Sequence, residues 1–309
     1  VEEGVELRRA GIERPVLVLG GIYPGQEEEI FAHRLVPCLF DLEAARRLDA
    51  GARAAGRIQP YHLKLDTGMG RVGFRPEELG AVLGELAALK GLAMEGVITH
   101  LALADEIEHP FTGEQLQRYR DCLAQVRGAG FAPALTHLAN SAALFSRDVP
   151  ECNMVRPGIF LYGGLPSGEF AGRLDLRPVM SFRTSVVQVK TVPAGTGVSY
   201  AHRFRAGRPT VLAAIPVGYA DGYSRHLTCK GEVLIRGRRA PVAGTVCMDW
   251  TLLDVTDIPG VAVGDPVTLL GRDNGNCITA DEWAARIGTI SYEVFCQVSK
   301  RVPRVYCGT

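Results

Sequence analysis

The segment Tyr61–Asp66 combines an apolar run with side chains that can carry charge or move protons. Its alternation places His62, Lys64 and Asp66 on one face of a strand, because successive strand residues point to opposite faces. A glycine-rich loop follows and ends at Arg71. Two interpretations stay open: a buried ion pair at the strand end, since Lys and Asp are seldom buried unpaired, or a functional site at the mouth of a barrel.

Polar residues also close three later segments of the chain. His100 and His137 each end a predicted strand, and Arg156 precedes a turn that contains Gly158. A single histidine after a strand is more often a hydrogen-bonding residue than a catalyst, but several at equivalent strand ends favour a shared site. The backbone N–H groups of the turn after Arg156 can face an anion at a helix start.

The elements that must position these residues alternate between apolar strands and helical stretches. Strands are expected at 16–19, 35–40, 61–65, 96–101, 135–138 and 154–160. Such repeats are typical of a parallel sheet covered by helices, and their number favours a closed (β/α)8-type, TIM-like barrel. From about residue 178 the pattern becomes β-rich with many turns, and a capping box at Thr279–Glu282 opens one helix. We therefore predict an α/β chain with a barrel over residues 1–177 and a mainly antiparallel β domain over residues 178–309.

The composition excludes several classes of protein. Of the 309 residues 47% are hydrophobic and 22% charged, and 34 basic residues balance 34 acidic ones. A charge-driven binder of nucleic acid or membrane is therefore not expected. The eight cysteines lie far apart without a C-x-x-C pair, so we expect reduced thiols, no metal site and a cytoplasmic protein. No apolar run approaches the roughly 18 residues that span a bilayer, and the first residues do not resemble a targeting signal.

Seven segments together resemble the motifs of bacterial alanine racemase, in that family's order and across essentially the whole chain. They are HLKLDTGMGRVGF (62–74), THLANSA (136–142), NMVRPGIFLYG (153–163), GVSYAH (197–202), PVGYADGYSR (216–225), GTVCMDW (244–250) and SYEVFCQVSKRVPR (291–304). The resemblance implies a fold-type III enzyme with pyridoxal 5′-phosphate at the mouth of a (β/α) barrel, a β domain, and a head-to-tail homodimer with sites at the interface. It also implies interconversion of L-alanine and D-alanine, which supplies D-alanine for peptidoglycan.

The resemblance implies roles for individual residues. Those expected to bind the cofactor are Arg71, His100, Ser141, Arg156, Gly158, Ile159 and Tyr292. Those expected to bind the substrate are Arg71, Tyr219, Met248 and Asp249. Arg156 would face the pyridine nitrogen, held in place by His100. Because a guanidinium stays protonated, it cannot give that nitrogen a proton, and the ring remains a weaker electron sink.

Racemisation requires acid–base groups on opposite faces of the substrate carbon. By resemblance, Tyr200 serves one face and is donated by the partner subunit. A tyrosine phenol needs neighbouring cations to ionise readily. Lys64 matches a position that is often carbamylated in this family, and carbamylation would turn a buried cation into an anion able to pair with Arg71.

The chain departs from the family at the lysine that should serve the other face. That Schiff-base lysine lies near the family's N-terminus in a stretch like V-V-K-A-[DN]-A-Y-G-H-G, which this sequence lacks. The chain's own lysines stand in other contexts and are Lys64, Lys90, Lys190, Lys230 and Lys300. Alignment of residues 16–20 with the family indicates that an N-terminal stretch with the first barrel strand is missing, so the barrel is expected to be incomplete.

Three explanations of this departure stay open: residues omitted from the sequence, a separate chain that supplies them, or a truncated protein. As written, the 309 residues are expected not to racemise alanine. The functional alternatives are a non-catalytic protein that binds pyridoxal phosphate and a racemase for serine or a broader set of amino acids. Single-domain barrels of pyridoxal phosphate homeostasis are disfavoured, because they lack a β domain.

Overall fold

The chain forms two compact units in a computed structural model that describes residues 1–307. The first unit is Val1–Gly158 and the second begins at Ile159. Two hydrogen bonds attach the start of the second unit to its later helices: the backbone N–H of Leu165 donates to Asp281, and the hydroxyl of Ser291 donates to the carbonyl of Leu165. The domain boundary between residues 177 and 178 stays a prediction.

Five parallel strands form the sheet of the first unit, in the order β1-β2-β3-β4-β5. They are β1 (Val16–Val18), β2 (Leu35–Leu39), β3 (Gln59–Lys64), β4 (Leu92–Ile98) and β5 (Leu135–His137). All five residues of β2 are buried, as expected for a strand covered on both faces. Because spatial order follows chain order, the sheet has the topology of a curled (β/α) barrel wall.

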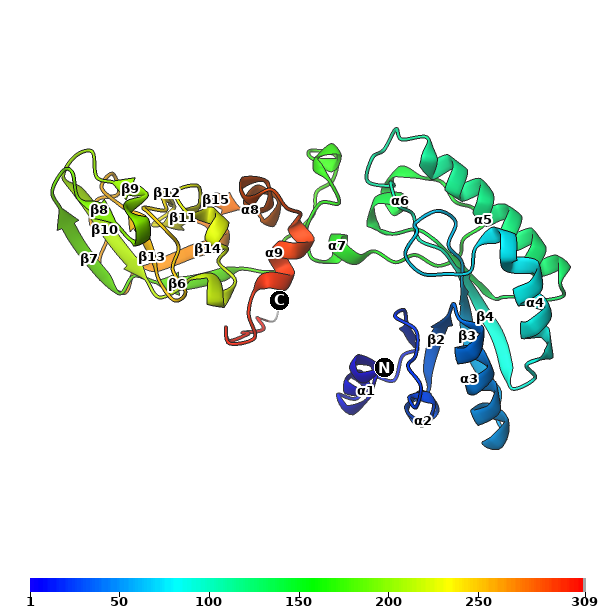
Figure 1. Cartoon of the computed structure of the whole chain (residues 1–309). Helices are drawn as coiled ribbons and strands as arrows, with labels where there is room; N and C mark the ends of the chain where they lie inside the picture. The colour runs from blue at the N-terminus through cyan, green and yellow to red at the C-terminus, as the bar shows by residue number, and fades with distance from the viewer. Residues whose placement is uncertain (308–309) are drawn as a thin grey trace. The chain divides into compact units, whose positions relative to one another are not determined.

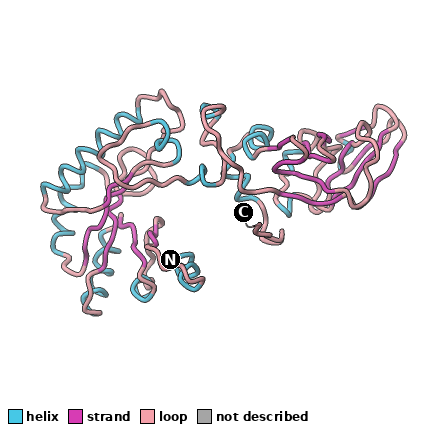
Figure 2. The backbone as a smooth tube through the Cα atoms, turned by 180° about the vertical axis from the view of Figure 1, so that it is seen from behind, coloured by secondary structure: helices cyan, strands magenta, loops and turns pink. Residues whose placement is uncertain are grey.

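Helices alternate with the strands of this unit. They are α1 (Glu2–Arg9), α2 (Glu27–Ala32), α3 (Leu42–Ala54), α4 (Leu79–Ala88), α5 (Phe111–Gly128) and α6 (Ser141–Ser146), with a 3₁₀ turn at η1 (Pro76–Glu78). Figure 1 shows α3, α4 and α5 along one side of the strands, and Figure 2 shows the strands side by side with these helices outside. In α5 the buried Tyr119 donates its hydroxyl to the carbonyl of Val97 at 2.8 Å, which fixes the helix to β4.

The prediction of a strand at 154–160 is wrong. This segment is irregular up to Pro157, and Gly158–Leu161 form the short helix α7. Pro157 has no N–H to donate, so a ladder beside β5 cannot continue through it. A hydrogen bond from the backbone N–H of Arg156 to the carbonyl of Ala139 (2.9 Å) still keeps Arg156 beside the end of β5.

The second unit is built from antiparallel strands. They are β6 (Phe182–Ser185), β7 (Gln188–Val192), β8 (Gly197–Val198), β9 (Phe204–Arg205), β10 (Thr210–Ile215), β11 (Glu232–Ile235), β12 (Arg238–Pro241), β13 (Thr251–Asp254), β14 (Pro266–Asp273) and β15 (Asn276–Ile278). Its helices are α8 (Ala280–Ile287) and α9 (Ser291–Gln297), with 3₁₀ turns η2 (Gly168–Phe170), η3 (Tyr200–His202), η4 (Tyr219–Asp221) and η5 (Arg225–Leu227). A parallel α/β unit followed by an antiparallel β unit confirms the predicted order of the two architectures.

The core of the second unit forms where α8 meets the sheets. Trp283 packs on Tyr223 with ring centroids 5.1 Å apart. The predicted cap of α8 is confirmed, because the hydroxyl of Thr279 accepts a hydrogen bond from the backbone N–H of Glu282 at 3.0 Å. The helix then ends at Gly288, whose left-handed conformation suits glycine.

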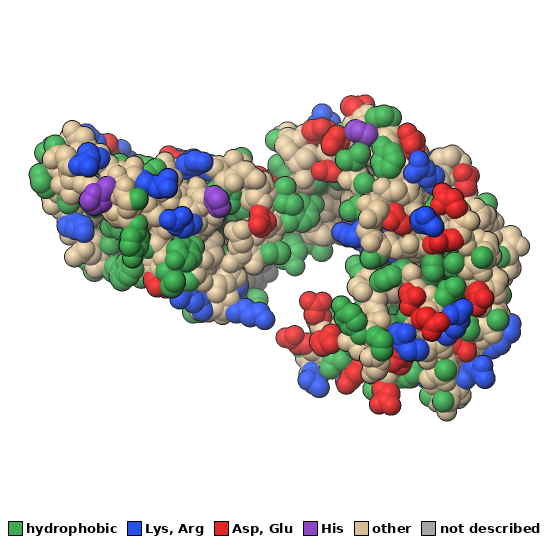
Figure 3. Space-filling model, viewed as in Figure 1, with side chains coloured by type: hydrophobic (Ala, Val, Ile, Leu, Met, Phe, Trp, Pro, Cys, Tyr) green, Lys and Arg blue, Asp and Glu red, His purple; other side chains and the backbone are tan. Residues whose placement is uncertain are grey.

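The two units carry opposite net charge. Residues 1–158 contain 22 acidic and 17 basic side chains, a net −5, and the remaining residues contain 12 acidic and 17 basic ones, a net +5. In Figure 3 both signs are mixed over the first unit, whereas Lys and Arg outnumber Asp and Glu on the visible face of the second. Within residues 1–307, no helix has the length and apolar character needed to cross a membrane.

Candidate active site

Lys64 is buried at the carboxyl end of β3. Its ammonium donates to the carbonyls of Leu65 (2.7 Å) and Val72 (3.1 Å). The pKa of Lys64 is lowered to about 8, chiefly by burial and also by the nearby cations Arg156 and Arg71, against the opposing effect of Asp66. The uncharged amine is therefore more populated near neutral pH than that of an exposed lysine, although the ammonium form predominates.

The carboxylate of Asp66 organises the glycine-rich loop after β3. It accepts hydrogen bonds from the backbone N–H groups of Gly68, Gly70 and Arg71, at 2.9 to 3.1 Å. Burial alone would raise the pKa of Asp66, but these N–H groups outweigh it and the pKa is lowered. Of the two interpretations of this strand end, an ion pair with Lys64 is not found among residues 1–307. The loop instead presents the exposed side chain of Arg71 near Lys64.

The guanidinium of Arg156 is the centre of the first unit's polar cluster. One terminal nitrogen donates to Nδ1 of His137 at 3.1 Å. The other lies 2.9 Å from the carbonyl of Thr99, 3.2 Å from that of Leu138 and 3.2 Å from Nδ1 of His100. All of these acceptors are uncharged, so Arg156 is a fixed cation without a carboxylate partner among residues 1–307.

Both histidines that hold Arg156 are kept neutral. Burial, followed by the charge of Arg156, lowers the pKa of His137 to about 3 and that of His100 to about 4. A guanidinium can only donate, so each Nδ1 must carry a lone pair toward it. The predicted contact between His100 and Arg156 is thus present, and His137 is a second partner. Sequence reasoning noted His137 as a strand-end residue but gave it no role.

Ser141, Gly158 and Ile159 were predicted to contact a phosphate. Ser141 is buried at the start of α6, whose Asn140 cap accepts from the backbone N–H of Ala143. The backbone N–H of Gly158 already donates to the carbonyl of Arg156 (2.9 Å), and no atom lies within 4 Å of where a Cβ on Gly158 would stand. There is therefore open space beside Gly158, but the N–H of this glycine is already used within the turn.

Ile159 and Tyr292 belong to the second unit. A Cβ added to Gly164 would lie 3.0 Å from both Ile159 and Phe295, so Ile159 packs beside α9, which carries Tyr292. The ring of Tyr292 is 40% exposed. The positions of these two residues relative to Ser141 stay a prediction.

Tyr200 lies in a strained turn of the second unit. The flanking residues Ser199, Ala201 and His202 have φ angles of 61°, 58° and 45°, in the left-handed region that side chains other than glycine rarely adopt. The hydroxyl of Thr245 fixes the turn by donating to the carbonyl of Tyr200 at 2.7 Å. The Tyr200 side chain is 71% exposed, so the turn presents the phenol to the outside of its own unit.

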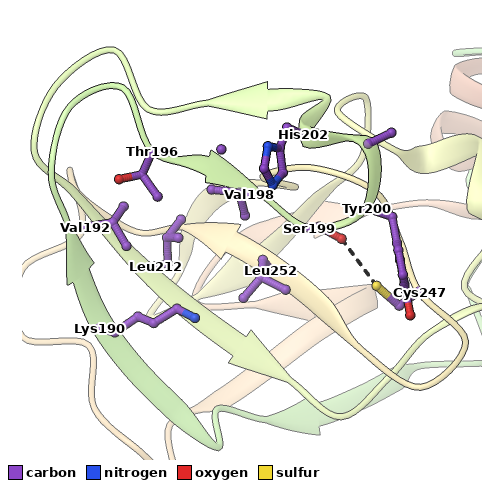
Figure 4. A pocket seen from close by; sticks show the side chains of 12 residues that line it. Lys190, Val192, Thr196, Val198, Ser199, Tyr200, His202, Leu212, Cys247 and Leu252 are labelled. Carbon is purple, nitrogen blue, oxygen red and sulfur yellow. Dashed lines mark hydrogen bonds between the residues drawn. The ribbon is translucent and has the colours of Figure 1, made fainter.

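The Tyr200 turn borders a cavity of about 550 Å³. Figure 4 shows Tyr200 beside Cys247, whose sulfur lies 3.3 Å from the hydroxyl of Ser199. Lys190 also lines this cavity, on strand β7. The link from Ser199 to Cys247 joins the turn of Tyr200 to the loop that carries Met248 and Asp249.

That loop is held against Tyr219 by backbone contacts. The N–H of Tyr219 donates to the carbonyl of Cys247 at 3.0 Å, and a Cβ on Gly218 would lie only 2.1 Å from the same carbonyl oxygen. The N–H of Met248 donates to no acceptor within residues 1–307. The structure therefore brings Tyr219, Met248 and Asp249 together.

Arg301 stabilises this loop and was missed by the sequence analysis. Its guanidinium donates to Asp249 at 2.6 Å and to Asp221 at 2.8 Å, which in turn accepts from the N–H of Gly218. The only signal in the sequence was a basic residue within the last of the seven motifs.

Comparison with known proteins identifies the family. Models described as "Alanine racemase, N-terminal domain" and "Alanine racemase, C-terminal domain" match residues 1–166 and 179–306. An alanine racemase from Geobacter sulfurreducens is 54% identical over 98% of this chain and 81% of its own length. The structure of alanine racemase from a D-cycloserine producing Streptomyces lavendulae is 38% identical, with a TM-score of 0.93 over 100% of this chain and 82% of the other. Another structure, of alanine racemase from Bartonella henselae with covalently bound pyridoxal phosphate, is 28% identical. Its TM-score is 0.88 over 99% of this chain and 83% of the other. The chain belongs to the alanine racemase family.

Proposed function

We propose that this protein interconverts L-alanine and D-alanine with pyridoxal 5′-phosphate as cofactor. The observation that carries the proposal is Arg156, a fixed cation held by two neutral histidines and two backbone carbonyls at the carboxyl end of a parallel sheet. The relatives named alanine racemase favour alanine as substrate over serine or a broader set, and they favour an enzyme over a non-catalytic binding protein.

The residues present fit the cofactor. Arg156 would hold its pyridine nitrogen, because the cluster fixes a donor and no carboxylate of residues 1–307 pairs with it. Ser141 and the turn at Gly158 would hold the phosphate, since the hydrogen bond from Arg156 to Ala139 joins these two segments. Ile159 and Tyr292 would complete that contact. When bound, pyridoxal phosphate supplies an electron sink that makes the α-proton of an amino acid removable.

The second unit supplies the groups that act on the substrate. The N–H of Met248, together with Tyr219 and Asp249, would orient the alanine and its carboxylate. Arg71 is proposed as a further substrate contact from the sequence resemblance. The phenol oxygen of Tyr200 would take the proton from one face of Cα or return it there. Its 71% exposure fits a residue that acts outside its own unit, in the site of a second copy.

A head-to-tail homodimer, in which Tyr200 of one copy acts in the site of the other, is supported by the charges of the two units. The first unit carries a net −5 and the second a net +5, so head-to-tail association places opposite charges together. Light scattering after size-exclusion chromatography should give twice the mass of one chain at low salt, with weaker association at high salt. A monomer at every salt concentration would count against it.

Lys64 is proposed to carry a carbamate. Its low pKa leaves the amine partly uncharged, so its nitrogen can add to CO₂ and release a proton. The carbamate would be an anion beside Arg71 and Arg156. Intact mass spectrometry under native conditions should show the added mass of one CO₂, absent in the Lys64→Ala variant.

We propose that the cofactor is not attached covalently to Lys64, Lys90, Lys190, Lys230 or Lys300, because none of these has the sequence context of the family's attachment site. Reduction of the protein with borohydride, followed by peptide mapping, should leave all five unlabelled. A label on one of them would contradict the proposal.

The racemisation itself is tested by replacing Tyr200 with Phe. Conversion of L-alanine to D-alanine, followed by chiral chromatography, should fall by at least about 100-fold, because loss of one acid–base group typically costs that much. The cofactor absorbance should stay, since the variant lacks only the phenol oxygen. Unchanged turnover would refute the assignment of Tyr200.

A further inference from the structure

Arg156 is the first member of a line of side chains that runs through the sheet. From Arg156 the line passes to Nδ1 of His137, and Nε2 of His137 lies 2.7 Å from Nδ1 of His62. Nε2 of His62 then lies 3.4 Å from the carboxylate of Glu95. Both rings are buried, with exposed fractions of 0% and 2%, while the side chain of Glu95 is 41% exposed. The line therefore connects the cofactor end of the cluster to a carboxylate at the surface.

Each contact in this line has a fixed direction. Arg156 can only donate, so Nδ1 of His137 accepts and the proton of that ring sits on Nε2. This proton points at Nδ1 of His62, which must accept it, and the proton of His62 then sits on its own Nε2. The carboxylate of Glu95 can only accept. The donor at one end and the acceptor at the other thus demand the same pair of tautomers.

The backbone places Glu95 for this contact by means of a β-bulge. In the β3–β4 ladder Tyr61 pairs with Met94 and His62 pairs with Gly96, so Glu95 is an extra residue without a partner. A bulge of this kind turns a side chain away from the regular alternation of its strand. Gly96 completes the arrangement, because a Cβ there would lie 2.6 Å from the ring of His62.

The charge state of the two rings agrees with this arrangement. Burial lowers the pKa of His62 and lowers that of His137 to about 3, while Glu95 opposes the shift at His62. Both rings are therefore neutral at neutral pH and have one N–H each. A protonated ring would have donors on both nitrogens and would break the line.

We infer that Glu95 is a positioning residue for Arg156: by accepting the Nε2 proton of His62 it fixes the tautomers of His62 and His137, and so keeps a lone pair on His137 turned toward the guanidinium. The role in catalysis rests on the proposed alanine racemase function, whereas the tautomers do not. No residue of the line except Arg156 touches the cofactor in this account.

The direct test is the tautomer of His62. The chain has seven histidines, so two-bond ¹H–¹⁵N spectra of the protein labelled at histidine can be resolved and assigned with single variants. We expect Nε2–H for both His62 and His137. In the Glu95→Lys variant a donor replaces the acceptor and opposes the tautomers that Arg156 demands, so His62 should shift toward Nδ1–H and its contact with His137 should be lost. An unchanged tautomer in that variant, or Nδ1–H at His62 in the wild type, would overturn the inference.

Activity provides the second readout. Glu95→Lys should lower kcat for alanine by about 10-fold or more, in the range found for partners of site residues, with little change in KM. Glu95→Gln retains an oxygen that accepts and should stay within about 2-fold of wild type. Glu29→Lys is the matched control, because Glu29 pairs with His33 at 3.1 Å on the surface of the same unit and should leave both readouts unchanged.

The outcomes separate the two claims. If Glu95→Lys and Glu95→Gln are equally active while the wild type racemises alanine, the positioning role is wrong. If the wild type does not racemise alanine but the tautomers switch as expected, the proposed function fails and the line of polar contacts stands. Circular dichroism of each variant shows whether it has folded.

Discussion

The buried His137 should make the first unit less stable in mild acid. The pKa of its ring is lowered from 6.5 to about 3, chiefly by burial and then by Arg156. In the unfolded chain the ring binds a proton below about pH 6.5, whereas the folded ring stays neutral. The stability that this group contributes is therefore present above pH 6.5 and is lost as the pH falls toward 3.

The magnitude follows from the linkage relation. A pH of 5 lies about 1.5 units below the ordinary histidine pKa of 6.5 and still above the pKa of about 3 that His137 has in the folded protein. Each unit corresponds to about 1.4 kcal/mol, so His137 should cost ~2 kcal/mol of unfolding free energy between pH 7.5 and pH 5. Because the ring is fully buried, solvent screening does not reduce this figure.

The assay compares wild type with His137→Gln, since glutamine keeps one donor and one acceptor and stays neutral at every pH. Urea unfolding of the first unit is followed by hydrogen exchange in peptides from β3, β4 and β5. Tryptophan fluorescence follows the second unit separately, because both tryptophans, Trp250 and Trp283, lie there. The loss between pH 7.5 and pH 5 should be about 2 kcal/mol smaller in the variant. A difference below about 0.5 kcal/mol would refute the assignment of His137 as a buried neutral ring.

Two further variants test the packing around the site. Gly96→Ala would press a Cβ against His62 at 2.6 Å and should destabilise the first unit by about 1–3 kcal/mol, whereas Gly113→Ala in α5, which meets no atom within 4 Å, should be neutral or slightly stabilising in the same urea titration. Arg301→Ala should raise the KM for alanine severalfold with a smaller effect on kcat, because it frees the loop of Asp249; equal KM values would show that the loop needs no such support.

The overall architecture could be predicted from the sequence because it is encoded by local patterns. Apolar runs separated by helical stretches predict parallel strands, and turn-rich alternation predicts antiparallel ones. The Thr279 cap was predictable for the same reason, since it depends on two residues only three positions apart, Thr279 and Glu282. The error at 154–160 came from reading an apolar run as a strand when Pro157 prevents pairing.

The site was predicted only in part, because its remaining members depend on contacts between distant segments. Strand ends and motifs pointed to Arg156 and His100. The importance of His62 and Glu95 depends on a β-bulge, and no pattern in the sequence marks the extra residue in a ladder. Arg301 contacts Asp249 from 52 residues away, a distance over which sequence periodicity carries no information.

The most direct test of alanine racemisation is the fate of the α-hydrogen when the protein, loaded with pyridoxal phosphate, acts on L-alanine in D₂O. Chiral chromatography with mass spectrometry should show D-alanine with one deuterium at Cα, and the two enantiomers should approach equal amounts. If the loaded protein leaves L-alanine unchanged, the assignment of Arg156, Tyr200 and the surrounding residues to alanine racemisation is contradicted.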